Sequence, residues 1–479
     1  MPEEEGPPAA VRPFSGRTAW ARSLQTPLQV FLRTEAGSAA VLLGSAVAAL
    51  AWVNISASSY DAVWGARLSV ILAGAGVSLD LREWVNSGLM TFFFFVFGLE
   101  ARREFDMGEL RERARVALPV AAGLGGLIIP VVIYLVLNAG RPAAHGWGAA
   151  MSTDSAFALG TLAVTGPRFP DRVRAFLLSV AVVDDLVSLV VIGAAYSKAV
   201  VLAPLGIAAG IFAVILLLRR AGIRYGIVYA AAGIAAWVAV LKSGVDPVVV
   251  GLVMGLLTFA YAPARTDLER ASDLFRSFRE QPTPELAQSA RAGLATALSP
   301  NERLQQLYHP WTSYVIVPLF ALANAGIPLS GTFLARAYTS PVTLGILIGY
   351  VAGKPLGITG ASWLLTRLSR GRLRPPVGWV TVAGVGTIAG IGFAVSILIA
   401  TLAFTGTQLQ EAKLGVLSTV IVAPAVTWLV FRAVGLLPAR LQVRALLGTA
   451  EVITDLGAPV DPARDRIRGP ARAPVTIVE

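Results

Sequence analysis

The sequence predicts an all-α polytopic membrane protein with about twelve transmembrane helices. Of its 479 residues, 55% are hydrophobic and 14% are charged, whereas ordinary soluble domains are about 45–50% apolar and about 25% charged. A helix needs about 20 apolar residues to cross the hydrocarbon core, and runs of that kind, punctuated by Gly, Pro and charges, recur along the chain. The expected spans are residues 37–55, 86–101, 116–138, 147–165, 175–195, 201–219, 225–241, 247–262, 311–329, 341–366, 379–403 and 412–436.

Basic residues set the expected orientation of these spans. Arginines cluster in the loops that follow even-numbered spans, and the intervening loops carry mostly single charges. Since cytoplasmic loops are the ones enriched in Arg and Lys, both termini are expected in the cytoplasm. The clusters are Arg102, Arg103, Arg111, Arg113 and Arg115 after span two, Arg168, Arg172 and Arg174 after span four, Arg219, Arg220 and Arg224 after span six, and Arg367, Arg370, Arg372 and Arg374 after span ten.

Composition and charge exclude several classes of protein. The net charge of +11 is spread over alternate loops and not gathered in one patch, so nucleic-acid binding is not predicted. The chain has no Cys, which excludes disulfides and thiolate chemistry, and its two histidines, His145 and His309, argue against a zinc site. No cofactor is expected. The first ~30 residues lack the pattern of a cleavable signal peptide.

Three regions are expected outside the spans. Residues 56–84 form an extracytoplasmic loop in which β-prone runs flank Gly74-Ala-Gly76, predicting a short β-hairpin. Residues 263–309 form a polar cytoplasmic loop with helix-compatible stretches, inside the membrane domain. The expected division of the chain is a cytoplasmic N-terminal segment at 1–34, a transmembrane domain at 35–437 and a disordered Pro- and Arg-rich cytoplasmic tail at 438–479.

Two adjacent aspartates, Asp184 and Asp185, lie near the middle of the span 175–195. About ten apolar or small residues flank them on each side, which puts both carboxyls roughly 15 Å from either face of a ~30 Å hydrocarbon core. Inserting one Asp at a helix centre costs roughly 2.5–3.5 kcal/mol. The pair therefore indicates a functional site, and the alternative is a buried structural network with no transport role. Adjacent helical residues point about 100° apart, so the two carboxyls can have different roles.

Lys354 lies near the middle of the span 341–366. Its side chain is too deep to bring the ammonium to water, so an ion pair with a carboxylate is expected in place of snorkelling. Asp154 lies within the short span that begins at Trp147. It is either a capping residue at a misplaced span end or part of a cation site, because Thr153, Ser152 and Ser155 put several hard oxygen ligands beside it.

Two spans show signs of interruption. Span eleven carries four glycines, and span four carries Gly146 and Gly148 before its Ser-Thr-Asp-Ser cluster. Glycines in membrane helices often serve close packing, but two interrupted segments in matching halves suggest inverted repeats whose discontinuous helices meet at the midplane. Half-helix ends of like partial charge would then face each other, and Asp154 or Lys354 could neutralise them. The glycines of span eleven are Gly384, Gly386, Gly390 and Gly392.

Six motifs in collinear order, between about residues 35 and 436, resemble the NhaA family of bacterial Na⁺/H⁺ antiporters. They are Phe97-Gly-Leu-Glu-Ala-Arg-Arg-Glu104, Thr153-Asp-Ser-Ala-Phe-Ala-Leu-Gly160, Val183-Asp-Asp-Leu186, Pro318-Leu-Phe-Ala-Leu-Ala-Asn-Ala-Gly326, Gly353-Lys-Pro-Leu-Gly-Ile358 and Ile388-Ala-Gly-Ile-Gly-Phe-Ala-Val-Ser-Ile397. The resemblance implies twelve spans in a bacterial inner membrane, with spans four and eleven unwound and crossing. It also implies homodimers formed through an extracytoplasmic hairpin, here residues 64–81.

Carried over position by position, the resemblance also assigns roles. Asp185 would be the principal Na⁺ and proton carboxylate, and Asp184 its neighbour and second Na⁺ ligand, which exchanges partnership with Lys354. Asp154 and Thr153 would line the crossing. The acidic and basic residues at the end of span two would sit at the cytoplasmic mouth, where a simpler interpretation makes them membrane-edge anchors. They are Glu100, Arg103 and Glu104.

The sequence departs from the family at histidines linked to the response to pH. Well-known members carry Glu-His-x-x-His before span nine, where this chain has Gln305-Gln-Leu-Tyr-His309, and a histidine after Leu-Lys-Ser-Gly-Val is here Asp246. His309 is the one histidine of this motif that is present in the chain, and it is expected at the cytoplasmic mouth. Because histidine is the side chain that titrates near neutral pH, the family's sharp pH activation is in question for this chain.

The functional hypothesis is an electrogenic antiporter that extrudes cytoplasmic Na⁺ or Li⁺ in exchange for external protons. The two ions would compete for the Asp185 carboxylate during alternating access. One alternative is a Na⁺-coupled symporter of an organic solute with the same architecture. Another is an intramembrane aspartyl protease, but that chemistry needs two aspartates converging from separate helices, so the chain is not expected to be an enzyme.

Overall fold

The chain is a mostly helical polytopic membrane protein with one small sheet, as seen in the computed structural model. The structure describes residues 19–72, 75–108, 113–165, 171–197, 200–221, 225–261, 265–375 and 377–436, with residues 438 and 445. Some of the expected features lie outside this part of the chain. They are residues 1–18 of the N-terminal segment, nearly all of the tail 438–479, the residue Gly74 of the hairpin turn, and the loop arginines Arg111, Arg168 and Arg224.

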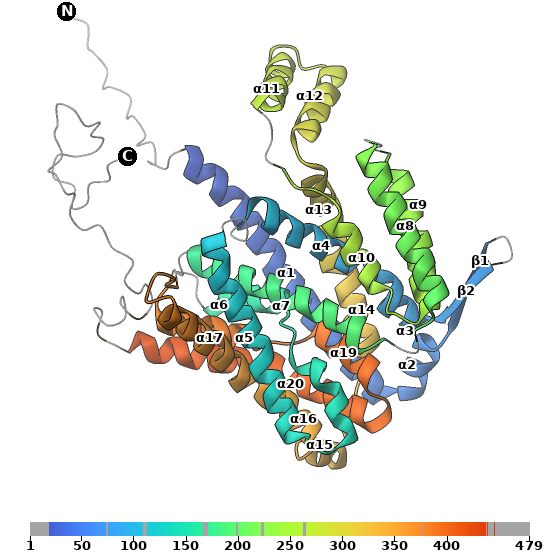
Figure 1. Cartoon of the computed structure of the whole chain (residues 1–479), viewed down its shortest axis with the longest axis vertical. Helices are drawn as coiled ribbons and strands as arrows, with labels where there is room; N and C mark the ends of the chain where they lie inside the picture. The colour runs from blue at the N-terminus through green and yellow to red at the C-terminus, as the bar shows by residue number, and fades with distance from the viewer. Residues whose placement is uncertain are drawn as a thin grey trace, which may run out of the picture.

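Helices follow one another along almost the whole described chain (Figure 1). Most are α-helices, η3 is a 3₁₀-helix, and η1, η4 and η5 are π-helical turns. The elements are α1 (Ala19–Ile55), α2 (Ala57–Trp64), β1 (Arg67–Leu72), β2 (Ala75–Asp80), α3 (Leu81–Glu83), η1 (Trp84–Leu89), α4 (Met90–Met107), α5 (Arg113–Leu137), η3 (Pro142–Ala150), α6 (Ser155–Thr165), α7 (Asp171–Ala195), α8 (Leu202–Arg220), α9 (Gly226–Ser243), α10 (Val248–Leu256), α11 (Arg265–Glu280), α12 (Pro284–Ala297), α13 (Pro300–Trp311), η4 (Thr312–Ile316), α14 (Val317–Asn324), α15 (Gly331–Ala337), α16 (Pro341–Ile348), η5 (Gly349–Gly353), α17 (Lys354–Leu368), α18 (Trp379–Ala389), α19 (Ala394–Ala403) and α20 (Gly406–Gly435).

In the described residues, eight helical stretches are long and apolar enough to cross a membrane. A ninth is the pair α18 and α19, which is bent by 50° at its break. The three other predicted spans, 147–165, 247–262 and 311–329, contain only shorter helices, namely η3 with α6, α10, and η4 with α14. The count of twelve spans therefore stays a prediction. The eight stretches are Gly37–Ile55, Leu81–Met107, Val116–Leu137, Arg172–Ala195, Leu202–Arg220, Gly226–Ser243, Pro341–Leu368 and Gly406–Gly435.

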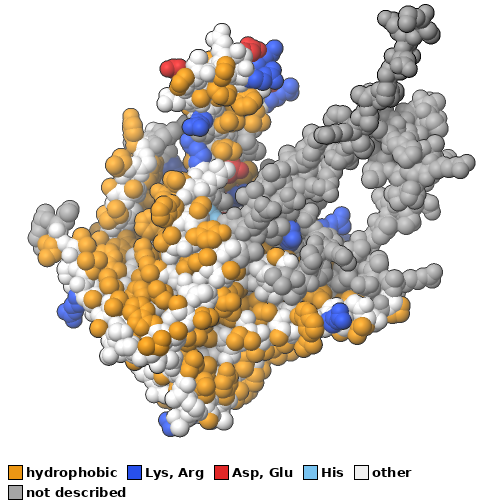
Figure 2. Space-filling view, turned by 180° about the vertical axis from the view of Figure 1, so that it is seen from behind, with side chains coloured by type: hydrophobic (Ala, Val, Ile, Leu, Met, Phe, Trp, Pro, Cys, Tyr) orange, Lys and Arg blue, Asp and Glu red, His pale blue; other side chains and the backbone are white. Residues whose placement is uncertain are grey.

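The outer surface of the helical body is apolar. Figure 2 shows hydrophobic side chains spread over much of one face, with Lys and Arg confined to its edges. Large aliphatic side chains on α8 and α9 are among the most exposed, including Leu202 at 78% and Ile227 at 81%. Such side chains would be unfavourable in water over so wide an area. This surface is suited to contact with lipid.

The predicted β-hairpin is present. Strands β1 and β2 pair antiparallel in a register that joins Arg67 to Asp80 and Leu72 to Ala75. The hairpin projects from the side of the helical body that carries the lower ends of α8 and α9 (Figure 1). Leu68, Val70 and Ile71 are about half or more exposed on it, so its surface is apolar as well as extended.

The polar loop 263–309 is helical. Helices α11 and α12 lie side by side and stand away from the spans, and α13 returns the chain to the body against α4 (Figure 1). Side-chain caps fix the starts of two of these helices. The Thr283 hydroxyl accepts the Leu286 N–H at the start of α12, and Ser299 and Glu302 form a reciprocal capping box at the start of α13.

Glycines bring α17 into backbone contact with α5, and this contact positions the helix that carries Lys354. A Cβ built on Gly357 would overlap the backbone of Gly125, and one on Gly125 would overlap Gly357 in return. Small residues at such contacts allow membrane helices to pack closely. One turn earlier, Gly353 at the end of η5 lies against Pro130 of α5, so the contact with α5 continues from α17 back into η5.

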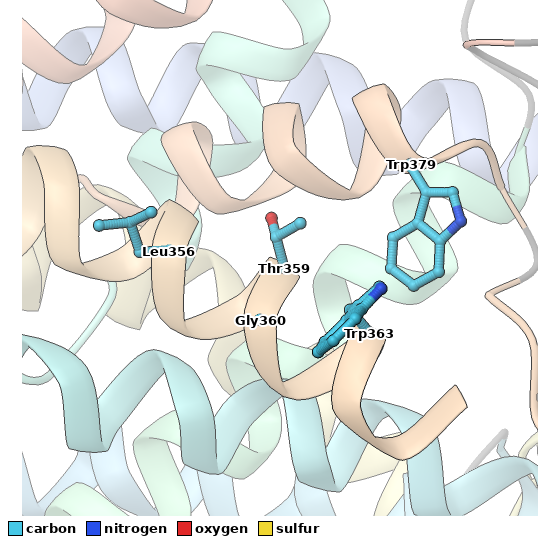
Figure 3. Close-up of a pocket in the computed structure, with 5 residues that line it drawn as sticks. All are labelled: Leu356, Thr359, Gly360, Trp363 and Trp379. Atoms are coloured by element: carbon cyan, nitrogen blue, oxygen red, sulfur yellow. The ribbon is translucent and has the colours of Figure 1, made fainter. Parts of the chain in front are cut away.

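The opposite side of α17 is open. A shallow apolar groove lies on the outer surface between α17 and the first residue of α18, and Figure 3 shows its lining. Nothing lies within 4 Å of a Cβ built on Gly360. The groove contains no ionisable side chain, so it is not a candidate ion site. Its lining residues are Leu356, Thr359, Gly360, Trp363 and Trp379.

The two faces of α17 predict opposite effects of the same substitution. Gly357→Ala should lower the free energy of unfolding by about 1–3 kcal/mol, because its methyl group overpacks the α5 contact. Gly360→Ala, one turn further on, should be neutral or stabilising, because Ala is the better helix former and its methyl group enters open space. Thermal melting of the detergent-purified protein measures both. Equal melting temperatures for the two variants would refute the close α5–α17 contact.

Candidate functional site

The two aspartates of α7 are deeply buried. Their exposed fractions are 1% for Asp184 and 5% for Asp185, and α7 is the most enclosed of the eight spanning stretches. The polar side chains around them come from the segment between η3 and α6, from α17 and from α19. The site is therefore assembled from parts of the chain more than 200 residues apart.

Asp184 forms a buried ion pair with Lys354, the pairing that the depth of Lys354 predicts. The Nζ–Oδ2 distance is 2.6 Å and both side chains are 1% exposed. The Lys354 ammonium also donates to the Thr153 hydroxyl at 3.0 Å. The Thr153 backbone N–H donates to the same Asp184 Oδ2 at 2.7 Å. The other oxygen of this carboxylate, Oδ1, is buried and has no hydrogen-bond partner among the described residues.

Asp185 has a different environment. The Ser152 hydroxyl donates to its Oδ1 at 3.2 Å, and no ion pair or second hydrogen bond to it is found among the described residues. Because adjacent side chains on a helix point about 100° apart, the two carboxyls have different partners. Asp184 faces the Lys354 ammonium, and Asp185 faces the neutral Ser152 hydroxyl.

Asp154 joins two helix N-termini. Its Oδ1 accepts the Phe157 N–H in the first turn of α6, and its Oδ2 accepts the Ala394 N–H at the start of α19, both at 3.2 Å. Its own N–H donates to Ile391 O at 2.7 Å. Asp154 is therefore a cap, one of its two expected interpretations. It caps two helices that begin at breaks.

The breaks in the two interrupted segments lie against each other. Residues 152–154 are non-helical between η3 and α6, and residues 391–393 are non-helical between α18 and α19. The Thr153 hydroxyl donates to Ala389 O, the last residue of α18, at 2.8 Å. Together with the Asp154 bonds, this contact joins the two non-helical segments by one bond between main chains and two between main chain and side chain.

The balance of charge in this site is uneven. Asp184 is paired with the Lys354 ammonium. Asp154 receives two helix N-termini, each of which carries roughly half a positive charge. Asp185 has no comparable partner in the described chain, although an isolated buried carboxylate is strongly disfavoured. The geometry therefore provides one carboxylate whose charge a proton or a bound cation would neutralise, with the Ser152 hydroxyl beside it as an oxygen of the kind that hard cations prefer.

The expected mouth residues lie on α4 and α13. Glu100 and His309 approach each other, with Oε1 and Nε2 3.8 Å apart and both side chains partly exposed. Arg103 is exposed, and Glu104 is partly buried one turn beyond Glu100. Asp246, which replaces a family histidine, accepts the Val248 N–H at the start of α10.

Sequence reasoning missed two members of the site. The hydroxyl of Tyr350, in η5, contacts Ala149 O, Ser152 O and the Ser396 hydroxyl. Ser396 lay inside a family motif but was not singled out, and Tyr350 was in none. A signal existed for Tyr350: a tyrosine four residues before Lys354 shares its helix face in the middle of a span.

Comparisons with known proteins agree on one family. Residues 29–431 match the family model described as Na⁺/H⁺ antiporter 1. The chain is 61% identical to the Na⁺/H⁺ antiporter NhaA 1 of Salinispora arenicola over 468 residues, which are 98% of this chain and 72% of that protein. It is equally similar to NhaA 3 of Salinispora tropica. It is 39% identical to NhaA 1 of Mycolicibacterium vanbaalenii, over 93% of this chain and 71% of that protein.

Removing one partner of the buried ion pair is expected to destabilise the folded protein. Lys354→Met should lower the free energy of unfolding by about 3–5 kcal/mol, because it leaves the Asp184 charge buried and uncompensated. The double variant Asp184→Asn/Lys354→Met should recover much of that loss. Thermal melting compares them, with Arg265→Gln as the control, since it breaks a solvent-exposed ion pair with Glu269 and should leave melting unchanged. Unchanged melting of Lys354→Met would contradict the pair.

Proposed function

The chain belongs to the NhaA family of Na⁺/H⁺ antiporters, multi-pass membrane proteins that exchange Na⁺ for H⁺, and from this premise we propose an electrogenic exchange of cytoplasmic Na⁺ or Li⁺ for external protons at Asp185. Na⁺ enters from the cytoplasm and displaces a proton from this carboxylate. Movement of one bundle against the other then exposes the loaded site to the outside. Protonation from outside releases the cation.

The observation that carries this proposal is the uncompensated charge of Asp185. A buried carboxylate paired with a fixed ammonium has little need of a mobile cation. A carboxylate held only by the Ser152 hydroxyl stays ionised in the bundle only with a cation beside it, and otherwise takes up a proton. One or the other must therefore occupy Asp185, and this is the condition for exchange of two ions at one site.

Asp184 takes the role of partner. Its Oδ1, which has no hydrogen-bond partner in the described part of the chain, can become a second Na⁺ ligand while Oδ2 keeps its bonds to Lys354 and to the Thr153 N–H. A cation there competes with the ammonium for the Asp184 charge. Lys354 can in this way respond to occupancy of the site, and Thr153, which contacts both side chains, lines the same space.

The electrogenic nature of the exchange depends on returning more than one proton for each Na⁺. The membrane potential then drives the cycle, because each charge that crosses is worth about 2.3 kcal/mol per 100 mV. The two buried carboxylates of α7 supply enough titratable groups for such a stoichiometry. Asp154 is not needed for it, because it is held by two helix N-termini.

The wider architecture that we propose has twelve spans, with the interrupted segments crossing near mid-membrane and both termini in the cytoplasm. Glu100, Arg103, Glu104 and His309 then lie at the cytoplasmic mouth. The β1–β2 hairpin lies outside and joins two copies of the chain. Its exposed apolar side chains, and the unpaired edges of a two-stranded sheet, support this role.

The rival functions are weaker. The matched relatives are named as antiporters, which does not favour a solute symporter. A protease would need two carboxyls converging on one water molecule. Here the neighbouring carboxyls of Asp184 and Asp185 face different partners, an ammonium and a serine hydroxyl.

Asp185→Asn is expected to abolish Na⁺-driven proton movement in everted membrane vesicles. The amide keeps the size of the side chain and its contact with Ser152, but it carries no charge and takes up no proton in the working range. The folded state should survive, with thermal melting unchanged or raised, because a costly buried carboxylate is removed. Asp273→Asn on the exposed face of α11 is the matched control and should exchange normally. Near-normal exchange by Asp185→Asn would refute the assignment.

Competition between the two ions predicts a specific pH dependence. Where Asp185 is mainly protonated, the apparent KM for Na⁺ should rise about tenfold for each unit by which the pH falls, while the maximal rate stays constant, because Na⁺ competes with a single proton for this one carboxylate. Na⁺ titrations of proton efflux from everted vesicles between pH 6 and 9 measure this slope. A maximal rate that falls with pH at constant KM would exclude competition at one site.

A further inference from the structure

Tyr350 is the largest polar side chain close to the site that the exchange mechanism does not use. It lies in the π-helical turn η5 and is fully buried. Its hydroxyl is 2.7 Å from Ser152 O and 3.1 Å from Ala149 O, and it also contacts the Ser396 hydroxyl. One phenol therefore links the C-terminal end of η3, the break before α6 and the first turn of α19.

The two carbonyl oxygens and the two hydroxyl oxygens in this cluster have only two hydroxyl protons among them. The two carbonyls can only accept, and the Tyr350 and Ser396 hydroxyls carry one proton each. The short distances are satisfied when Ser396 donates to Tyr350 and Tyr350 donates to Ser152 O. The carbonyl of Ser152 then depends on the tyrosine for its main donor, because the alternative donor, Ser396, is 3.2 Å away.

The glycines of the second break make room for this side chain. A Cβ built on Gly392 would lie 2.5 Å from the Tyr350 ring, and one on Gly390 would lie 2.7 Å from Tyr350 O. The segment at the break thus closes over the tyrosine from the α19 side. The phenol occupies a fitted position, and its hydroxyl has little freedom to turn toward other partners.

Tyr350 is also tied to the ion pair. It precedes Lys354 by four residues, and the ammonium lies 6.0 Å from the centre of its ring. Lys354 begins α17 directly after η5, and Pro355 lacks the N–H that would close a regular helical turn there. A π-turn of this kind often marks a functional position within a helix. The Tyr350 hydroxyl in this turn donates to Ser152 O, and the Lys354 ammonium directly after the turn donates to Asp184.

We propose that Tyr350 is a positioning residue that sets the Na⁺ affinity of the site, by holding the Ser152 backbone where the Ser152 hydroxyl meets Asp185. The inference rests on the proposed function and adds to it a residue that determines affinity. The reasoning is geometric: the carbonyl of Ser152 is fixed by Tyr350, and the hydroxyl of the same residue donates to Asp185. Without the phenol hydroxyl, the Ser152 carbonyl lacks its closest donor, and the ligand set around Asp185 loses its preformed geometry.

The test is Tyr350→Phe in the full-length protein reconstituted in liposomes, with Na⁺ titrations of proton movement at several pH values. The apparent KM for Na⁺ should rise about five- to tenfold with the maximal rate within about twofold of wild type, as expected for lost ground-state binding. Since Na⁺ then competes less well with protons, the pH of half-maximal exchange at subsaturating Na⁺ should move up by about 0.7–1 unit.

Two other buried tyrosines provide matched controls. Tyr134 donates to Ala143 O and Tyr196 donates to His145 O, so each holds the η3 backbone through a hydroxyl at 2.8 Å. Among the described residues, neither hydroxyl has a hydrogen bond to residues 152–154. Tyr134→Phe and Tyr196→Phe should leave the KM and the pH profile unchanged. A KM shift of the same size in these controls would reduce Tyr350 to a general stabiliser of η3 and overturn the proposal.

Ser396→Ala tests the same cluster should Tyr350→Phe fail to fold. It removes the hydroxyl that donates to Tyr350 and should raise the KM in the same direction, and the effects of the two substitutions combined should be less than additive. A wild-type KM in either single variant refutes the positioning role. That result differs from failure of the proposed function, in which wild type itself shows no exchange or Asp185→Asn retains it.

Discussion

The structure depends on how buried charge is balanced near the middle of the membrane domain. Three carboxylates and one ammonium lie among apolar helices, and each must be compensated there because water is largely absent. Lys354 compensates Asp184, and two helix N-termini compensate Asp154. Those N-termini exist only because two helices are broken. The breaks, the glycines that allow them and the placement of α17 therefore belong to one electrostatic arrangement, and Asp185 is the carboxylate that it leaves without a charged partner among the described residues.

The glycines of the second interrupted segment serve both purposes that their sequence pattern suggested. Gly384 and Gly386 lie inside α18, where an added Cβ would overlap Phe431 and meet the backbone of Pro355 at 2.5 Å. Gly390 and Gly392 lie at the break and accommodate Tyr350. Close packing and interruption are not alternatives in this segment. The helix packs tightly before the break, and at the break the two glycines leave room for Tyr350.

A response to pH does not require the histidines that this chain lacks. Asp246, at a position where the resemblance implies a histidine, caps the start of α10, and His309 lies 3.8 Å from the Glu100 carboxylate. Competition between H⁺ and Na⁺ for a single carboxylate is itself a pH response, because binding of the cation requires the deprotonated form.

The sequence by itself determined the membrane class, most of the spans, the β-hairpin and the identity of the ionisable residues in the site, because each depends on local composition or on the cost of charge in lipid. It also predicted that Lys354 would pair with a carboxylate. The family resemblance added that Asp184 would be this partner, as the structure shows. Only the tertiary structure decided that Asp154 caps two helices at once, and that Tyr350 and Ser396 join the breaks. The bonds from Tyr350 to Ser152 O and from the Ala394 N–H to Asp154 link residues 198 and 240 positions apart, and each uses a backbone carbonyl or N–H group. Every residue has such groups, so no pattern of side chains reveals which of them will meet.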